Sequence, residues 1–133
     1  MYEVSAVLLA AGESTRMGRQ KALLPWQGTT LLSHQVSNLL EAGVSKVVTV
    51  LGYRAETLRP SLQGIPGVIT VLNLRYRTGK VSSIRAGLRQ VSPESTAVLV
   101  ISVDQPRSAL LMRRTIQAHN EQGLLITYPV YGG

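Results

Sequence analysis

The residues best suited to chemistry lie in one glycine-rich segment near the start of the chain, LLAAGESTRMGRQKALLPW at residues 8–26. Its glycines would allow backbone N–H groups to approach a polyphosphate closely, and Ser14 adds a hydroxyl donor. Arg16 and Lys21 bring two cations to the same segment, where each could pair with phosphate oxygens. The segment therefore predicts an anion-binding loop.

This segment does not match the two commonest phosphate-binding patterns. A P-loop carries Lys-Ser or Lys-Thr after its second glycine, and a dinucleotide-binding loop has the spacing G-x-G-x-x-G. The next β-branched run ends at Gly52, where a dinucleotide-binding fold would place an acidic residue for the ribose. Two interpretations stay open at this point: a specific phosphate cradle, or an ordinary loop that contains Gly, Ser and Arg.

A second chemical feature, SVDQP at residues 102–106, follows the most strand-like run of the chain. Ligands of open α/β sheets bind beyond the carboxyl ends of the strands, so Asp104 falls where ligands gather. Pro106 ends the strand there. Asp104 is a candidate ligand for a divalent cation, and the alternative is a turn or helix-capping residue.

Short apolar runs and helical stripes alternate along the whole chain. The runs typical of buried strands are residues 4–10, 46–51, 68–72, 96–102 and 124–128. Four helices are predicted. The first begins at a Thr29 or Thr30 cap and ends at Gly43, and its apolar stripe is Leu31, Leu32, Val36, Leu39 and Leu40. A shorter helix is expected at residues 55–62, a third has the stripe Val81, Ile84, Leu88 and Val91, and a fourth at residues 109–122 is capped by Ser108. This alternation predicts an α/β fold with a parallel sheet covered by helices on both faces.

Composition limits the class of protein. The chain has 133 residues, 44% of them hydrophobic, which suits one domain with a core of ordinary size. Fourteen basic and seven acidic side chains give a net charge of +7, which favours nucleotides or phosphorylated metabolites as partners. The basic residues form no run and have no interleaved aromatics, so nucleic acid is not expected.

Location is predicted from two further features. The absence of cysteine excludes a disulfide framework, a thiolate metal site and a catalytic thiol, and it fits a reducing cytoplasm. The first apolar run follows no basic segment of the signal-peptide kind and is far shorter than the ~20 residues of a spanning helix. We therefore expect a cytoplasmic protein with no membrane partner.

Three motifs together resemble the MobA-like nucleotidyltransferases, and most closely the molybdenum cofactor cytidylyltransferases among them. The motifs are LAAGESTRMGRQKALLPWQG (residues 9–28), NLRYRTGKVSSIRAGL (residues 73–88) and the Asp-Gln-Pro of SVDQP. Their order and spacing match over essentially the whole chain, and the first is the most specific. The resemblance implies a three-layer, Rossmann-like α/β fold of the nucleotide-diphospho-sugar transferase type, with a mostly parallel sheet and helices on both faces.

The resemblance assigns roles by position. It implies that Leu9, Ala10, Ala11 and Gly12 line the base and ribose, that Arg16 and Lys21 with Ser14 hold the triphosphate, and that Asp104 binds Mg²⁺. Attack by an acceptor phosphate on the α-phosphorus brings two anions together, so the reaction needs cations and a metal more than a general base. Lys21, Arg16 and Asp104 are the catalytic residues expected on this basis.

The middle motif departs from the family pattern. The family carries Asn-Pro and an acidic residue before the glycine, whereas this chain has Asn73-Leu74 and then Arg-Thr-Gly-Lys at residues 77–80. Base or ribose recognition by Asn73, Ser82 and Ser83 is one interpretation, and a purely helix-starting role for the two serines is the other. The basic residues of this motif form either a solvated loop or an added phosphate clamp, and they are Arg75, Arg77 and Lys80.

The predicted reaction is transfer of CMP from Mg²⁺-CTP to the terminal phosphate of molybdopterin cofactor, with release of pyrophosphate. Ala10-Ala11 favours CTP over GTP, because the guanylyltransferase branch of the family usually has Gly-Gly there. One rival is a cytidylyl or uridylyl transferase for a phosphorylated sugar or alcohol. Another is a non-catalytic module that binds the nucleotide, the cofactor or a molybdoenzyme.

Family members continue well beyond the position of Gly133, through a segment with a Gly-His-Pro motif that helps to bind the acceptor. The resemblance therefore implies a single MobA-like domain over residues 1–133 that lacks the family's C-terminal acceptor-binding portion. Such a chain is expected to bind Mg²⁺-CTP but to transfer CMP slowly or not at all by itself, because phosphoryl-type transfer depends on positioning both reactants. It is also expected to self-associate through the open sheet edge at residues 124–128.

Overall fold

A four-stranded parallel sheet forms the centre of the computed structural model, which describes residues 3–12, 15–16, 19–26, 28–103 and 108–122. Its strand order is β7-β6-β1-β8. β1 (Val4–Ala10) pairs with β6 (Lys46–Leu51) on one side and with β8 (Ala97–Ser102) on the other, and β7 (Val68–Leu72) pairs with β6. The predicted α/β class and parallel sheet are confirmed.

The central position of β1 explains its composition. All seven of its residues are buried, because paired strands flank it and helices cover both of its faces. Ala6, Leu8 and Ala10 belong to the larger core cluster on one face, whereas Val7 and Leu9 belong to the smaller cluster on the other. A run without polar alternation is what a strand buried on both faces requires.

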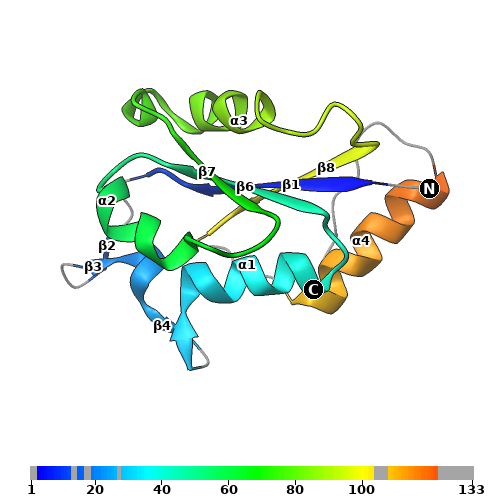
Figure 1. Cartoon of the computed structure of the whole chain (residues 1–133), viewed down its shortest axis with the longest axis horizontal. Helices are drawn as coiled ribbons and strands as arrows, with labels where there is room; N and C mark the ends of the chain where they lie inside the picture. The colour runs from blue at the N-terminus through cyan, green and yellow to red at the C-terminus, as the bar shows by residue number, and fades with distance from the viewer. Residues whose placement is uncertain (1–2, 13–14, 17–18, 27, 104–107, 123–133) are drawn as a thin grey trace, which may run out of the picture.

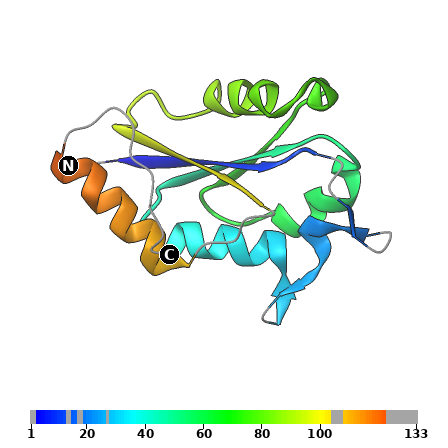
Figure 2. The same ribbon diagram turned by 180° about the vertical axis from the view of Figure 1, so that it is seen from behind.

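Helices lie on both faces of the sheet, so the molecule has three layers (Figure 1). α3 (Lys80–Leu88) covers one face, and α1 (Leu31–Glu41) and α4 (Ala109–Gln122) cover the other, as the reverse view also shows (Figure 2). The short elements between these are β2 (Thr15–Arg16), β3 (Arg19–Gln20), η1 (Lys21–Leu23), β4 (Pro25–Trp26), β5 (Thr29–Thr30), α2 (Ala55–Leu58), η2 (Arg59–Leu62) and η3 (Tyr76–Thr78).

Local signals set the ends of the helices. The Thr30 hydroxyl accepts a hydrogen bond from the Ser33 N–H at 3.2 Å and caps α1, and Gly43 follows that helix with a φ of +101°. Ser108 caps α4 in the same way, by accepting from Leu111 N–H at 3.1 Å. Both predicted caps and the predicted stop are confirmed.

The predicted helix at residues 55–62 is divided into α2 and η2. Pro60 lies at the start of η2 and has no N–H to donate, so the α-helical hydrogen-bond pattern cannot continue through it. The predicted strand at residues 124–128 lies outside the described residues. Within the part of the chain that the structure describes, no helix is long and apolar enough to cross a membrane.

The buried face of α3 differs from the predicted stripe. Val81 and Leu88 are 61% and 45% exposed, whereas Ser83 and Gly87 are buried. A Cβ built on Gly87 would lie 2.5 Å from Val7 Cγ1 and 3.0 Å from Val50 Cγ2, so the helix backbone lies almost directly on the sheet. Close approach at this glycine selects the small face of α3 for burial, which hydrophobic periodicity alone did not predict.

Candidate functional site

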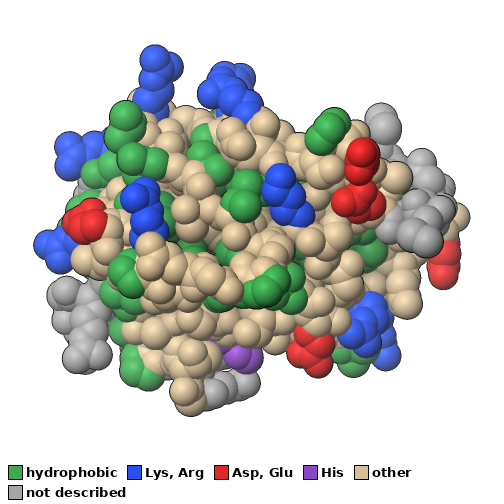
Figure 3. All heavy atoms as spheres, in the orientation of Figure 1, with side chains coloured by type: hydrophobic (Ala, Val, Ile, Leu, Met, Phe, Trp, Pro, Cys, Tyr) green, Lys and Arg blue, Asp and Glu red, His purple; other side chains and the backbone are tan. Residues whose placement is uncertain are grey.

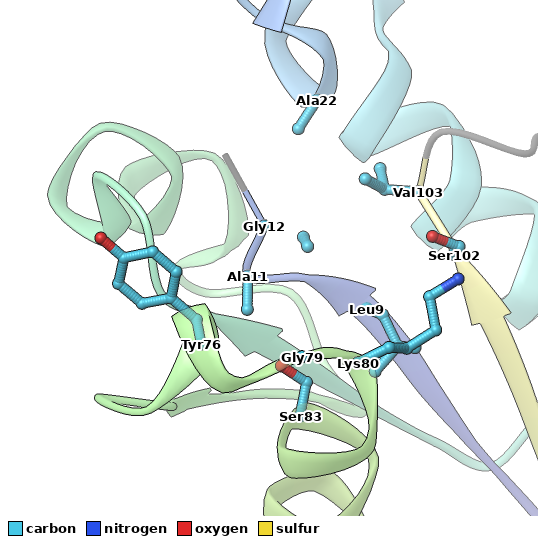
Figure 4. A pocket seen from close by; sticks show the side chains of 11 residues that line it. Leu9, Ala11, Gly12, Ala22, Tyr76, Gly79, Lys80, Ser83, Ser102 and Val103 are labelled. Atoms are coloured by element: carbon cyan, nitrogen blue, oxygen red, sulfur yellow. The ribbon is translucent and has the colours of Figure 1, made fainter. Parts of the chain in front are cut away.

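A pocket of about 270 Å³ opens at the carboxyl ends of β1 and β8, beside the start of α3 (Figure 4). It lies where ligands of open parallel sheets bind. The residues that line it are Leu9, Ala10, Ala11, Gly12, Ala22, Tyr76, Gly79, Lys80, Ser83, Ser102 and Val103. Three segments far apart in the sequence therefore meet at one cavity.

The end of β1 forms a rigid wall of the pocket. Leu9, Ala10 and Ala11 are all buried. The carbonyl of Leu9 accepts from Val103 N–H at 3.0 Å, and the carbonyl of Ala11 accepts from Tyr53 N–H at 2.9 Å. Since alanine covers little of the backbone, peptide groups of this wall can approach a flat or polar ligand closely.

Gly12 continues this wall where the strand ends. A Cβ built on it would meet no atom within 4 Å among the described residues, and its φ lies outside the left-handed range that favours glycine. Neither folding strain nor packing within the described protein explains the absence of a side chain here. Close approach of a ligand to the backbone would explain it.

Tyr76 lies beside Ala11 at one side of the pocket and rests on Gly52 (Figure 4). A Cβ on Gly52 would lie 2.7 Å from Tyr76 Cβ and 2.8 Å from the carbonyl oxygen of Ala11. The Tyr76 ring also lies 6.2 Å from that of Tyr53, with the two planes inclined by 56°. Gly52 thus allows the ends of β1 and β6 and the Tyr76 ring to meet, which accounts for glycine where a dinucleotide-binding fold has an acidic residue.

Asn73, Ser82 and Ser83 lie together, and their polar atoms largely satisfy one another. The Asn73 amide donates to Ser82 Oγ at 3.0 Å and to Ser83 Oγ at 2.9 Å, and its carbonyl oxygen accepts from Arg75 N–H at 3.0 Å. Ser82 Oγ donates to the carbonyls of Arg75 and Gly79. Only Ser83 of the three lines the pocket. The network fixes the corner between η3 and α3.

Lys80 brings positive charge to the pocket, and it is the one charged side chain among the described lining residues. Its side chain extends from the start of α3 across the pocket, with the ammonium toward Ser102 (Figure 4). Elsewhere the basic side chains lie apart, with no continuous patch on the face shown in Figure 3. Among the described residues, positive charge at this cavity therefore comes from Lys80.

Other predicted site residues are only partly described. Arg16 lies in β2, where it pairs with Arg19, and Lys21 begins η1 next to the pocket residue Ala22. The side chains of Arg16 and Lys21 lie outside the structural description. Ser14 and Asp104 lie outside the described residues altogether, although Asp104 follows the pocket residue Val103 in the chain.

Comparison with known protein families shows which family the chain belongs to. Residues 6–133 match the MobA-like NTP transferase domain. The chain belongs to the MobA-like NTP transferase family. The family predicted from the three motifs is therefore confirmed, and the match includes every residue that lines the pocket.

Curated relatives of this MobA-like domain differ in activity. The molybdenum cofactor cytidylyltransferase of Escherichia coli K12 is 27% identical over 133 residues, which are 100% of this chain and 67% of the relative. The bifunctional protein GlmU of Symbiobacterium thermophilum is 36% identical over 91% of this chain, but the match covers 26% of GlmU. Nicotine blue oxidoreductase of Paenarthrobacter nicotinovorans is 39% identical over 77% of this chain and 50% of its own length.

A solved structure supports the same fold. Rv0371c of Mycobacterium tuberculosis H37Rv superposes with a TM-score of 0.78 and 30% identity, covering 90% of this chain and 61% of its own. A second structure of Rv0371c is a complex with manganese. The MobA-like domain described here thus spans only part of the length of several of its relatives.

Sequence reasoning missed several residues of the MobA-like pocket. Four of them line the pocket and lie within the three motifs, but sequence reasoning assigned them no role; they are Ala22, Tyr76, Ser102 and Val103. The signals that could have found them are positional: Ser102 ends a strand parallel to β1, Val103 follows it, and Tyr76 lies three residues after Asn73. Their role depends on the register of the sheet, which composition does not encode.

Proposed function

We propose that this chain is the nucleotide-binding part of a nucleotidyltransferase that moves CMP from Mg²⁺-CTP to the terminal phosphate of molybdopterin cofactor. The observation that carries the proposal is the pocket at the carboxyl ends of β1 and β8, which places Leu9–Gly12 at its wall directly before the basic, glycine-rich segment. The relationship to the Escherichia coli cytidylyltransferase supports the choice of reaction.

In the proposed reaction an oxygen of the acceptor phosphate forms a bond to the α-phosphorus of CTP. The bond between that phosphorus and the oxygen bridging to the β-phosphorus breaks, and pyrophosphate leaves with the electron pair. The pocket would hold the nucleoside against the peptide groups of β1, while Arg16 and Lys21 neutralise charge on the triphosphate. Ser83 keeps a hydroxyl hydrogen for the ligand, because its oxygen already accepts from Asn73.

The proposal includes a divalent cation held by Asp104. The described residues contain no group of three or more histidines or carboxylates that could hold a metal. A single carboxylate such as that of Asp104 suits Mg²⁺, which typically takes one or two carboxylates and completes its ligands with water and substrate phosphates. When bound, the ion would neutralise charge on the triphosphate. The manganese complex of Rv0371c supports a divalent ion in this family.

Titration of the protein with CTP, GTP, ATP and UTP in the presence of Mg²⁺ tests the nucleotide assignment. We expect the tightest binding for CTP, and pyrophosphate release when molybdopterin cofactor is added to the CTP complex. Preference for GTP would overturn the CMP assignment. Binding without pyrophosphate release would favour a non-catalytic module over a complete transferase.

Two substitutions test the roles assigned to charge. Lys21→Ala should weaken CTP binding while leaving the midpoint of thermal unfolding nearly unchanged. Asp104→Asn should remove the Mg²⁺ dependence of binding, since an amide is a poor ligand for a hard cation. A Lys21→Ala protein that melts early yet binds CTP normally would identify Lys21 as structural, and unchanged Mg²⁺ dependence in Asp104→Asn would reject the metal role.

Structural similarity to the CTP:phosphocholine cytidylyltransferase of Streptococcus pneumoniae, with a TM-score of 0.62 and 26% identity, supports a second candidate: transfer of a cytidylyl or uridylyl group to a phosphorylated sugar or alcohol. The acceptor distinguishes the two reactions. A single-turnover assay that offers CTP or UTP with either molybdopterin cofactor or a sugar 1-phosphate would identify the acceptor through the labelled product. A sugar nucleotide as the faster product would replace the first proposal.

A further inference from the structure

Lys80 differs from the other described residues of the pocket in charge and in partners. The remaining lining side chains are apolar, hydroxyl-bearing or absent, so the described wall contains no carboxylate to pair with the ammonium. In the part of the chain that the structure describes, the Lys80 side chain makes no hydrogen bond or ion pair with protein. Its ammonium nevertheless lies over the pocket, toward the end of β8 (Figure 4).

The backbone that carries Lys80 is held in place by a glycine turn and by hydrogen bonds from Ser82 and Asn73. Gly79 precedes it with a φ of +117°, a conformation that glycine adopts without strain. Ser82 Oγ donates to the Gly79 carbonyl at 2.8 Å and receives a hydrogen bond from the buried amide of Asn73. The position of the Lys80 Cα is therefore fixed, although the ammonium at the end of its side chain is exposed.

A ligand that fills the pocket must satisfy this ammonium. Displacing water from a charge without supplying a partner is costly, and a charged phosphate oxygen is a stronger partner than a neutral hydroxyl or carbonyl. The far side of the pocket, with Tyr76 and the peptides of Ala11 and Gly12, has no charged side chain among the described residues and suits an uncharged ring. A nucleoside seated there would direct its first phosphate toward the Lys80 side.

We propose that Lys80 is a specificity-determining residue that binds an α-phosphate oxygen of the nucleotide, in addition to the cations of the glycine-rich segment. The proposal rests on the proposed function insofar as the ligand is a nucleotide. Lys80 distinguishes nucleotides from nucleosides and free bases at this pocket. The distinction comes from charge at one position on α3, independent of the loop at residues 8–26.

The test compares Lys80→Met with Arg85→Met. Methionine keeps most of the length of the lysine side chain and removes its charge. Arg85 lies on the same helix, is exposed and does not line the pocket, so its substitution removes the same charge from the molecule elsewhere. Calorimetric titration of each protein with cytidine, CMP and CTP gives the dissociation constants, and thermal unfolding confirms that both variants fold.

Lys80→Met is expected to weaken binding of CMP and CTP by about 10- to 100-fold and that of cytidine by less than about twofold. Arg85→Met should change all three by less than about twofold. An equal loss for cytidine would overturn the proposal by assigning Lys80 to the base or ribose, and unchanged CMP binding would show that Lys80 is only solvated. If the unaltered protein binds neither CMP nor CTP, the proposed function fails, and the inference fails with it.

Discussion

Gly52→Ala adds one methyl group directly after β6, where Gly52 contacts the pocket residues Ala11 and Tyr76. The φ of Gly52 lies outside the left-handed range, so alanine is not strained by its own backbone, and the whole penalty comes from contact. The new Cβ would lie 2.7 Å from Tyr76 Cβ, 2.8 Å from Tyr76 Cγ and 2.8 Å from the Ala11 carbonyl oxygen. A backbone carbonyl and the Cβ and Cγ atoms of a tyrosine cannot move aside as the far end of a flexible side chain can.

The expected loss can be worked from these contacts. Overpacking a tight site costs about 1–3 kcal/mol, and replacing glycine returns about 0.4–1 kcal/mol through the unfolded chain, so a net loss of about 1–2 kcal/mol is expected. For a domain of this size that is a fall of roughly 4–8 °C in the midpoint of thermal unfolding. Because Ala11 and Tyr76 both line the pocket, CTP affinity should also fall, on the order of tenfold.

Thermal unfolding followed by circular dichroism and calorimetric titration with Mg²⁺-CTP measure the two effects. Gly12→Ala is the matched control, since it adds the same methyl group at the same pocket with no atom of the described residues within 4 Å. It should leave stability within about 0.5 kcal/mol while weakening CTP binding through contact with the ligand. Unchanged stability and unchanged CTP affinity in Gly52→Ala would refute the close packing of Tyr76 on Gly52.

Three further substitutions test the core and the α3 corner. Thr49→Val should stabilise the fold by about 1–2 kcal/mol in urea unfolding, because the fully buried Thr49 hydroxyl has no hydrogen-bond partner among the described residues; a loss of stability would reveal an unseen partner. Asn73→Ala should destabilise by about 1–3 kcal/mol in the same assay, since it leaves buried polar partners unpaired, and a purely ligand-binding Asn73 would show no such loss. Gly87→Ala should destabilise by ~1 kcal/mol, because the clash with Val7 and Val50 exceeds the gain in helix propensity, whereas a net gain would show that α3 can move outward.

The strands and caps could be predicted from sequence because their signals are local. The predicted bounds of β1, β6 and β7 match the structure residue for residue, since each is a short apolar run that ends at a glycine or a polar residue. Thr30 and Gly43 fix α1 through hydrogen bonding and backbone conformation that involve only their own neighbours. Such features need no knowledge of the rest of the fold.

The orientation of α3 and the composition of the pocket could not be predicted in this way. Hydrophobic periodicity favoured a face with Val81 and Leu88 inside, but the contact that decides the orientation is between Gly87 and two valines on different strands. Likewise, Tyr76 lines the pocket because Gly52, directly after β6, has no side chain that would clash with Tyr76. Both outcomes depend on distances between segments, which a single sequence does not state.

The same close contact connects packing to the site. Lys80, Ser83 and Gly87 recur at spacings of three and four residues, so they share one face of α3, and that face lies over the sheet. Gly87 lets the helix lie low on Val7 and Val50, which in turn brings Ser83 and Lys80 to the end of β1, where the pocket opens. A helix buried through Val81 and Leu88 instead would turn Ser83 away from the cavity. Burying the small, partly polar face of α3 leaves Val81 and Leu88 exposed and so reduces the apolar area that the helix buries. The same orientation places the Ser83 hydroxyl and the positive charge of Lys80 at the pocket, which gives this face a physical reason.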